Sequence, residues 1–171
     1  PNNPNNPKAQ PLNLSGVAQE GATIASLLNV SQEDWLREKE ASEYNLFKKS
    51  NFQRSIVHIA SHAHLMPMAP LESYVVLAAG NNEDGKVQVK ELLSKYQNSM
   101  NTDLLVLSAC DTNRGENKIQ PGDDIAALSN AFLVAGAKNV LATQWPAVDA
   151  TFPQIMTLFY KDLLKGSNHA V

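Results

Sequence analysis

Four short apolar runs divide the chain, and each is bounded by polar or turn-forming residues. Continuous runs rich in Val, Ile and Leu are typical of strands buried on both faces, as in a parallel sheet. The four predicted strands are SIVHIAS (55–61), SYVVLAA (73–79), DLLVLSA (103–109) and NVLATQW (139–145).

Apolar residues at helical spacing precede, separate and follow these runs. One predicted helix has Asp123 as its cap and Gly136 as its stop. Strands that alternate with helices predict an α/β sandwich whose central sheet is mostly parallel and flanked by helices. The predicted helices cover 14–30, 41–50, 86–96, 123–137 (Ile125, Leu128, Phe132 and Ala135 on one face) and 151–164 (Phe152, Ile155, Phe159 and Leu163 inward).

Length, charge and cysteine content narrow the class of protein. The 171 residues suffice for one domain, and the Pro- and Asn-rich residues 1–13 are expected to be a tail or linker ahead of a domain over 14–171. A net charge of −3 without a basic block argues against nucleic acid and anionic membranes as partners. No apolar run is long enough to span a bilayer, and the single cysteine fits a reducing compartment, so we expect a cytoplasmic protein.

Two strand ends carry side chains that are suited to catalysis. His62 follows the first apolar run, and Cys110, the only cysteine, follows the third. Functional groups in open parallel sheets gather beyond the carboxyl ends of the strands. A thiol there could act as a nucleophile, with a nearby imidazole that takes up its proton and returns it to a leaving amine.

Two simpler interpretations remain open at this point. A lone cysteine after an apolar strand is usually a small buried hydrophobe. A metal site is the other, because His58, His62 and His64 stand at even spacing and could share one face of a strand. Against it, His58 lies inside the run, and Pro67 with Pro70 indicates that the chain has left the strand by His64.

Several segments together resemble the CHAT family, caspase-like peptidase domains that often follow tetratricopeptide repeats and are related to separase. The resemblance covers most of residues 55–166, in the order and approximate spacing of the family. The matching segments are VHIASHA (57–63), LLVLSACDTNRG (104–115), GDDIAALSNAFLVAGAKNVLATQWPAVDA (122–150) and FYKDLLKG (159–166).

The resemblance implies a caspase-like three-layer sandwich and a cysteine endopeptidase that needs no cofactor and no metal. It makes His62 the general base and acid, and Cys110 the nucleophile. The oxyanion would be bound by the backbone N–H groups of Ala63 and Cys110. The family commonly has glycine where this chain has Ala63, and alanine would be costly there if the backbone needed a positive φ.

The resemblance also implies a substrate pocket and a partner. Asp149 matches an acidic position that faces the substrate's P1 side chain, which predicts a basic P1 residue, although Asp149 could equally cap a helix. Asp111 could be a second pocket acid or a turn residue. The substrate would be a protein or peptide, and a repeat or sensor domain or subunit would regulate access.

The chain also resembles a partial domain or a fragment of a processed precursor. The loop at 111–124 contains Arg114 and Lys118 and is a candidate for self-cleavage. Two rivals to the peptidase are a non-catalytic CHAT-like scaffold and, behind it, a metal-dependent hydrolase.

Overall fold

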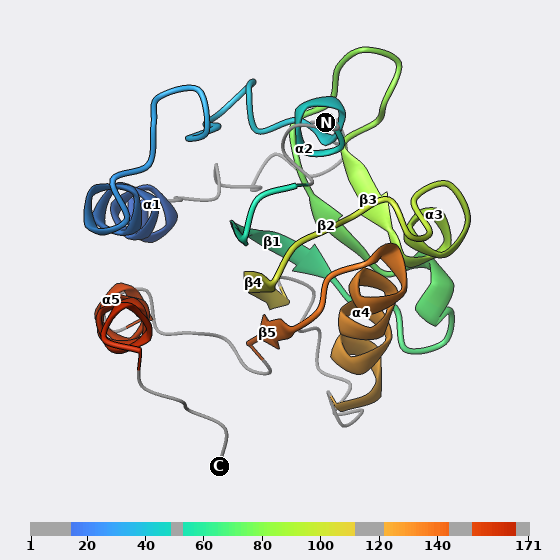
Figure 1. Ribbon diagram of the computed structural model, residues 1–171. Coiled ribbons are helices and arrows are strands. Elements are labelled where there is room, and N and C mark those ends of the chain that lie inside the picture. Colours follow the sequence, from blue (N-terminus) through green and yellow to red (C-terminus); the bar gives the residue numbers. More distant parts are fainter. Residues whose placement is uncertain (1–14, 49–52, 112–121, 144–151, 167–171) are drawn as a thin grey trace. The chain divides into compact units, whose positions relative to one another are not determined.

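The fold combines a sheet with helices that precede, interrupt and follow its strands (Figure 1). The computed structural model describes residues 15–48, 53–111, 122–143 and 152–166. In chain order the elements are α1 (Ser15–Leu27), α2 (Glu43–Leu46), β1 (Ile56–His64), the 3₁₀ helix η1 (Pro70–Glu72), β2 (Tyr74–Val76), β3 (Lys86–Gln88), α3 (Val89–Ser94), β4 (Leu104–Asp111), α4 (Gly122–Ala135), β5 (Val140–Ala142) and α5 (Phe152–Leu164).

The five strands form one mixed sheet in the order β3-β2-β1-β4-β5. β4 runs parallel to both of its neighbours, whereas β2 is antiparallel to both β1 and β3. The α/β class predicted from the sequence is therefore confirmed, and the sheet is parallel in part rather than mostly.

The antiparallel pairing of β2 follows from the length of the connections on either side of it. Nine residues separate β1 from β2, and nine separate β2 from β3. A parallel crossover needs a dozen residues or more, so chains this short can only reverse direction. The start of the predicted helix 86–96 is instead the strand β3, because these residues pair with β2, and the helix α3 begins only at Val89.

The central strands β1 and β4 are longer than their apolar runs. Their ladder has eight register pairs, from Ile56 opposite Leu104 to Ala63 opposite Asp111. The sequence placed the end of the first strand before His64, but β1 includes this residue. Pairing with β2 and β4 keeps the polar end of β1 extended.

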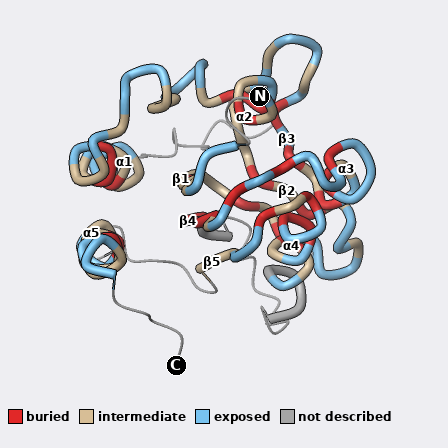
Figure 2. Tube along the Cα trace, in the orientation of Figure 1, coloured by how far each residue is buried: buried red, intermediate tan, exposed pale blue. Residues whose placement is uncertain are grey.

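One face of the sheet, with α3 and α4, forms the hydrophobic core. Figure 2 shows buried residues concentrated in the strands and in these two helices. In α4, Leu128, Phe132 and Ala135 are fully buried, as their spacing predicted, while the side chain of Ile125 is outside the described part. The predicted helix at 41–50 is only the short α2, which buries Leu46.

α4 ends where its sequence predicts and begins slightly earlier. Gly136 has a φ of +113°, and a Cβ at this position would collide with the carbonyl oxygen of Met100. Only glycine fits such a stop without strain. The helix begins at Gly122, so Asp123 lies in its first turn and is not the cap that we predicted.

The chain divides into two compact units, and the one that contains the sheet, the sheet unit, is Ser31–Ala147. The other unit combines Pro1–Val30 and Val148–Val171, and in it α1 packs against α5. In α5 the buried side chains are Met156 and Tyr160, whereas Ile155, predicted to point inward, is 53% exposed. Burial raises the pKa of the Tyr160 phenol, and the charge of Glu20 in α1 adds to the rise. The tail predicted over 1–13 lies outside the described residues.

Candidate active site

The candidate active site lies at the carboxyl ends of two neighbouring parallel strands. His62 is near the end of β1, and Cys110 is the last residue but one of β4. The two are register partners, so their backbones lie side by side at the strand spacing of about 4.8 Å. The fold thus brings together the two residues that the sequence singled out, from positions 48 apart in the chain.

His62 lies on the face of β1 opposite the core. Successive residues of a strand alternate between faces, and its neighbours Ile59 and Ala63, which belong to the other set, are buried in the core cluster. The side chain of His62 is partly buried, and its Nε2 atom is shielded from solvent.

Ala63 lies within the ladder and has Val75 on one side and Asp111 on the other as register partners. It is 2% exposed, and its φ is not positive. Alanine therefore causes no backbone strain here. The role of its N–H in binding an oxyanion stays a prediction.

Two hydroxyl groups, which the sequence analysis missed, hold the strands on either side of the pair. Ser61 Oγ, next to His62, donates a hydrogen bond to the carbonyl of Val76 in β2. Thr143 Oγ1 donates to the carbonyl of Ala109, next to Cys110, at 3.0 Å. Hydroxyl residues inside or just after apolar strands are the signal that could have identified these anchors.

The other two histidines of β1, His58 and His64, have positions that the pairing of the strand explains without a metal ion. His64 is the register partner of Tyr74, and the two rings stack with centroids 4.9 Å apart. His58 is in register with Val106, well inside the ladder. Along a strand, positions 58 and 64 are about 20 Å apart, too far for one metal ion to bind both. Within the described ranges, the residues grouped closely enough to ligate a metal are three glutamates in another part of the sheet unit.

The predicted P1 pocket falls outside the part of the chain that the structure describes. Asp149 is not among the described residues, and neither are Arg114 and Lys118. Asp111 is the last residue of β4, and only its backbone is described.

The comparison with protein families shows which family the chain belongs to. The family described as CHAT domain matches residues 1–171. The chain belongs to the CHAT domain family. This family is related to caspase-like peptidases.

Two further findings concern this CHAT domain. A search of curated proteins returned no match. None of the helices in the described ranges is both long enough and apolar enough to cross a membrane.

Proposed function

We propose that this CHAT domain is a cysteine endopeptidase in which Cys110 is the nucleophile and His62 is the general base and acid. The observation that supports the proposal is the register between β1 and β4, which pairs these two positions. Register partners in neighbouring parallel strands present their side chains to the same face of the sheet. A thiol and an imidazole placed in this way are within reach of one proton transfer.

The proposed reaction has two steps. His62 takes the thiol proton, the sulfur of Cys110 forms a bond with the carbonyl carbon of the substrate, and the C–N bond breaks as His62 gives the proton to the leaving amine. Water then attacks the thioester with His62 as base, the C–S bond breaks, and the thiol is restored. The backbone N–H groups of Ala63 and Cys110 would bind the oxyanion in both steps.

The remaining parts of the proposal come from the family resemblance. Asp149 and Asp111 would favour Arg or Lys at P1, helices on both faces of the sheet would complete a caspase-like three-layer sandwich, and a repeat or sensor domain would control access. The substrate would be a protein.

Ala63 gives specific support to a second candidate, a scaffold without catalytic activity. A strand residue between two hydrogen-bonded neighbours normally uses its N–H for the ladder. Because Ala63 is paired on both sides, donating to an oxyanion would require the ladder to open at this residue. A scaffold would keep the register of His62 and Cys110 and lack turnover.

The proposal can be tested with a peptidyl acyloxymethyl ketone that carries Arg at P1, followed by intact mass. We expect one adduct on the wild type and none on Cys110→Ala or His62→Ala. His64→Phe is the matched control, because it retains a ring to stack on Tyr74 and should be labelled normally. Far-ultraviolet circular dichroism must show that each variant is folded.

The choice of probes separates the dyad from the pocket. Labelling by a probe with Leu at P1 but not by the Arg probe would support the dyad and contradict the basic P1 preference. The absence of an adduct with every P1 residue, in folded protein, would favour the scaffold.

A further inference from the structure

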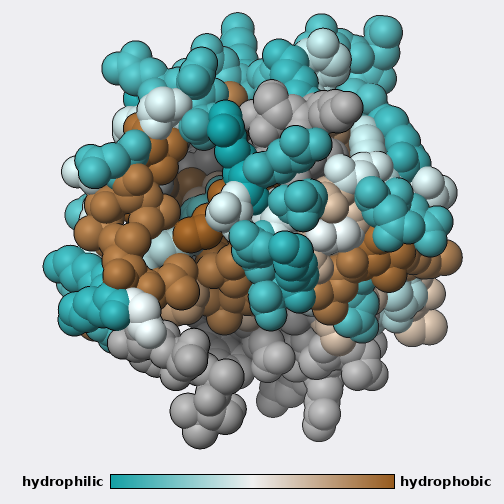
Figure 3. Space-filling model, viewed as in Figure 1, coloured by the Kyte–Doolittle hydropathy of each residue, from teal (hydrophilic) through white to brown (hydrophobic). Residues whose placement is uncertain are grey.

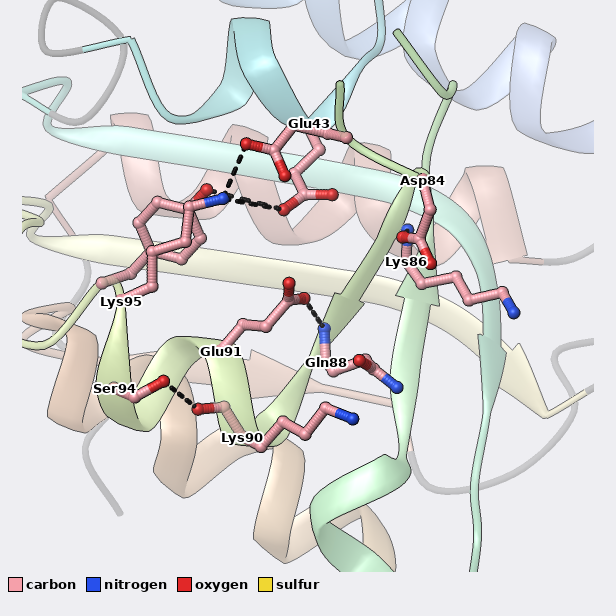
Figure 4. A network of polar contacts seen from close by, with 10 residues as sticks. Glu43, Asp84, Lys86, Gln88, Lys90, Glu91, Ser94 and Lys95 are labelled. Carbon is pink, nitrogen blue, oxygen red and sulfur yellow. Dashed lines mark hydrogen bonds and ion pairs between the residues drawn. The ribbon is translucent and has the colours of Figure 1, made fainter. Parts of the chain in front are cut away.

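Three glutamates from separate segments converge at one place in the sheet unit, away from His62 and Cys110. Glu43 begins α2, Glu83 lies in the loop between β2 and β3, and Glu91 lies in α3. One carboxylate oxygen from each lies within 4.8 Å of the others. Figure 4 shows the carboxylate of Glu43 directed towards the ammonium of Lys95, and that of Glu91 directed towards the backbone N–H of Gln88.

Local hydrogen bonds position two of these glutamates. Glu91 completes a capping box at the start of α3, where its Oε2 accepts a hydrogen bond from the N–H of Gln88 at 3.0 Å. Glu43 follows Ser42, whose side chain caps α2 by accepting from the N–H of Asn45. The carboxylate of Glu91 is therefore held by a hydrogen bond, and the cap of α2 fixes the backbone next to Glu43.

Glu43 is the residue that points to a missing ligand. It is fully buried, and its Oε2 atom has no hydrogen-bond partner among the described residues. Its Oε1 atom has only distant ones, the hydroxyl of Tyr96 at 3.5 Å and the ammonium of Lys95 at 3.9 Å. Buried carboxylates are ordinarily paired, hydrogen-bonded or bound to a metal, and an unsatisfied oxygen is costly.

Lys95 provides the positive charge in this arrangement. Its ammonium donates to Glu83 Oε1 at 2.6 Å while it remains 3.9 Å from Glu43. Partial burial lowers the pKa of Lys95, but hydrogen bonds and charge interactions with Glu83 and Tyr96 together outweigh it, so the pKa is raised overall. The lysine side chain is 44% exposed, so it can turn into solvent when another cation takes its place.

We propose that Glu43, Glu83 and Glu91 form a binding site for one Ca²⁺ ion, which displaces the ammonium of Lys95. Ca²⁺ takes oxygen ligands at about 2.3–2.6 Å in flexible geometry, and oxygens within 4.8 Å of one another fit such a sphere. The ion would satisfy the buried Oε2 of Glu43. The surface over the β2–β3 loop, at the top of Figure 3, is hydrophilic.

Several ionisable groups surround the buried carboxyl of Glu43. Burial raises the pKa of Glu43 to about 7, and the charges of Glu91 and Glu83 contribute. The other ionisable groups around Glu43 are Asp84 on the β2–β3 loop, and Lys95 and Tyr96 after α3.

Calorimetric titration of the full chain with CaCl₂ tests the site. We expect one equivalent of Ca²⁺ to bind, with a rise in Tm of roughly 5 °C at saturation that EDTA reverses. Glu83→Gln should weaken binding at least tenfold. Glu72→Gln is the matched control, since Glu72 is paired with Lys90 outside the cluster, and should bind as the wild type does.

The change in Ca²⁺ affinity in Lys95→Met decides whether the ion competes with the ammonium of Lys95. This substitution removes the competing ammonium and keeps the apolar stem, so Ca²⁺ should bind about tenfold more tightly to it than to the wild type. The proposal is overturned if 10 mM CaCl₂ leaves the Tm unchanged, or if Lys95→Met weakens binding. A larger response to MgCl₂ than to CaCl₂ would overturn the choice of ion.

Discussion

His62 and Cys110 are direct register partners in the parallel ladder between β1 and β4. The ladder continues for only one more pair, Ala63 and Asp111. Because side chains alternate between faces along a strand, a shift of one residue in either strand would separate the imidazole and the thiol.

Moving the cysteine by one position should therefore remove its reactivity. Ala109 is 3% exposed and belongs to the core cluster, so a thiol there faces away from His62. In the double variant Ala109→Cys/Cys110→Ala, we expect no labelling by the ketone and no native-state reaction with Ellman's reagent. Wild-type Cys110 should react with both, and both proteins should react with Ellman's reagent in urea. Equal native reactivity would contradict the register.

Replacing Ala63 by the glycine that is common in the family should raise neither the stability nor the reactivity of this chain. Ala63 is buried in a regular strand without a positive φ, so glycine relieves no strain. We expect Ala63→Gly to lower the free energy of unfolding by about 1 kcal/mol, because glycine loses more entropy on folding. The rate of ketone labelling should stay within about twofold of the wild type. Much faster labelling would show that the alanine methyl obstructs the site.

Gly136 should tolerate substitution poorly. Gly136→Ala combines a positive φ with a collision against the Met100 carbonyl, and it should cost about 3 kcal/mol or more. Gly80→Ala is the control, since a Cβ there meets nothing within 4 Å, and its cost should stay below about 0.5 kcal/mol. Urea unfolding measures both. Equal costs would show that α4 can end without a left-handed residue.

The buried carboxyl of Glu43 should make stability depend on pH. Its pKa is about 7 in the folded protein, against 4.5 ordinarily, so the folded state retains a proton that the unfolded state has lost. The resulting stabilisation is complete below pH 4.5 and is lost as the pH rises through 7. Its size is on the order of 3 kcal/mol.

Urea unfolding in EDTA from pH 4.5 to pH 8 measures this contribution. Glu43→Gln should lose the decline and be more stable than the wild type at pH 8. The pKa of the exposed Glu72 is lowered by its hydrogen bond to Lys90, so Glu72→Gln should keep the decline. If the free energy of unfolding of Glu43→Gln fell with pH as steeply as that of the wild type, the carboxyl of Glu43 would be excluded as the cause of the decline.

The sequence predicted where strands lie better than how they pair. Burial produces the same apolar runs in parallel and antiparallel strands, so 73–79 indicated a strand and not its direction. The short connections on either side of β2 determine its direction. The ends of β1 and β4 were placed too early because His62 and Cys110 are polar positions, held in the ladder by pairing and not by apolar character. The end of β2 was placed too late, since this strand stops at Val76.

The buried face of α5 and the acidic cluster were beyond the reach of local patterns. In α5 two adjacent stripes are apolar, and only packing selects Met156 and Tyr160 over Ile155. Glu43, Glu83 and Glu91 lie far apart in the sequence, and each alone resembles a solvated surface charge. Their convergence needs α2, the β2–β3 loop and α3 to be in place.

The packing of α1 against α5 sets an order of events during synthesis. α1 leaves the ribosome early, but its partner begins at Phe152, about 125 residues later. At 5–20 residues per second, the buried face of α1, with Ile24 and Ala25, waits roughly 6–25 s for its partner helix. During that interval the nascent chain presents an uncovered apolar helix while the strands β1 to β5 are being synthesised.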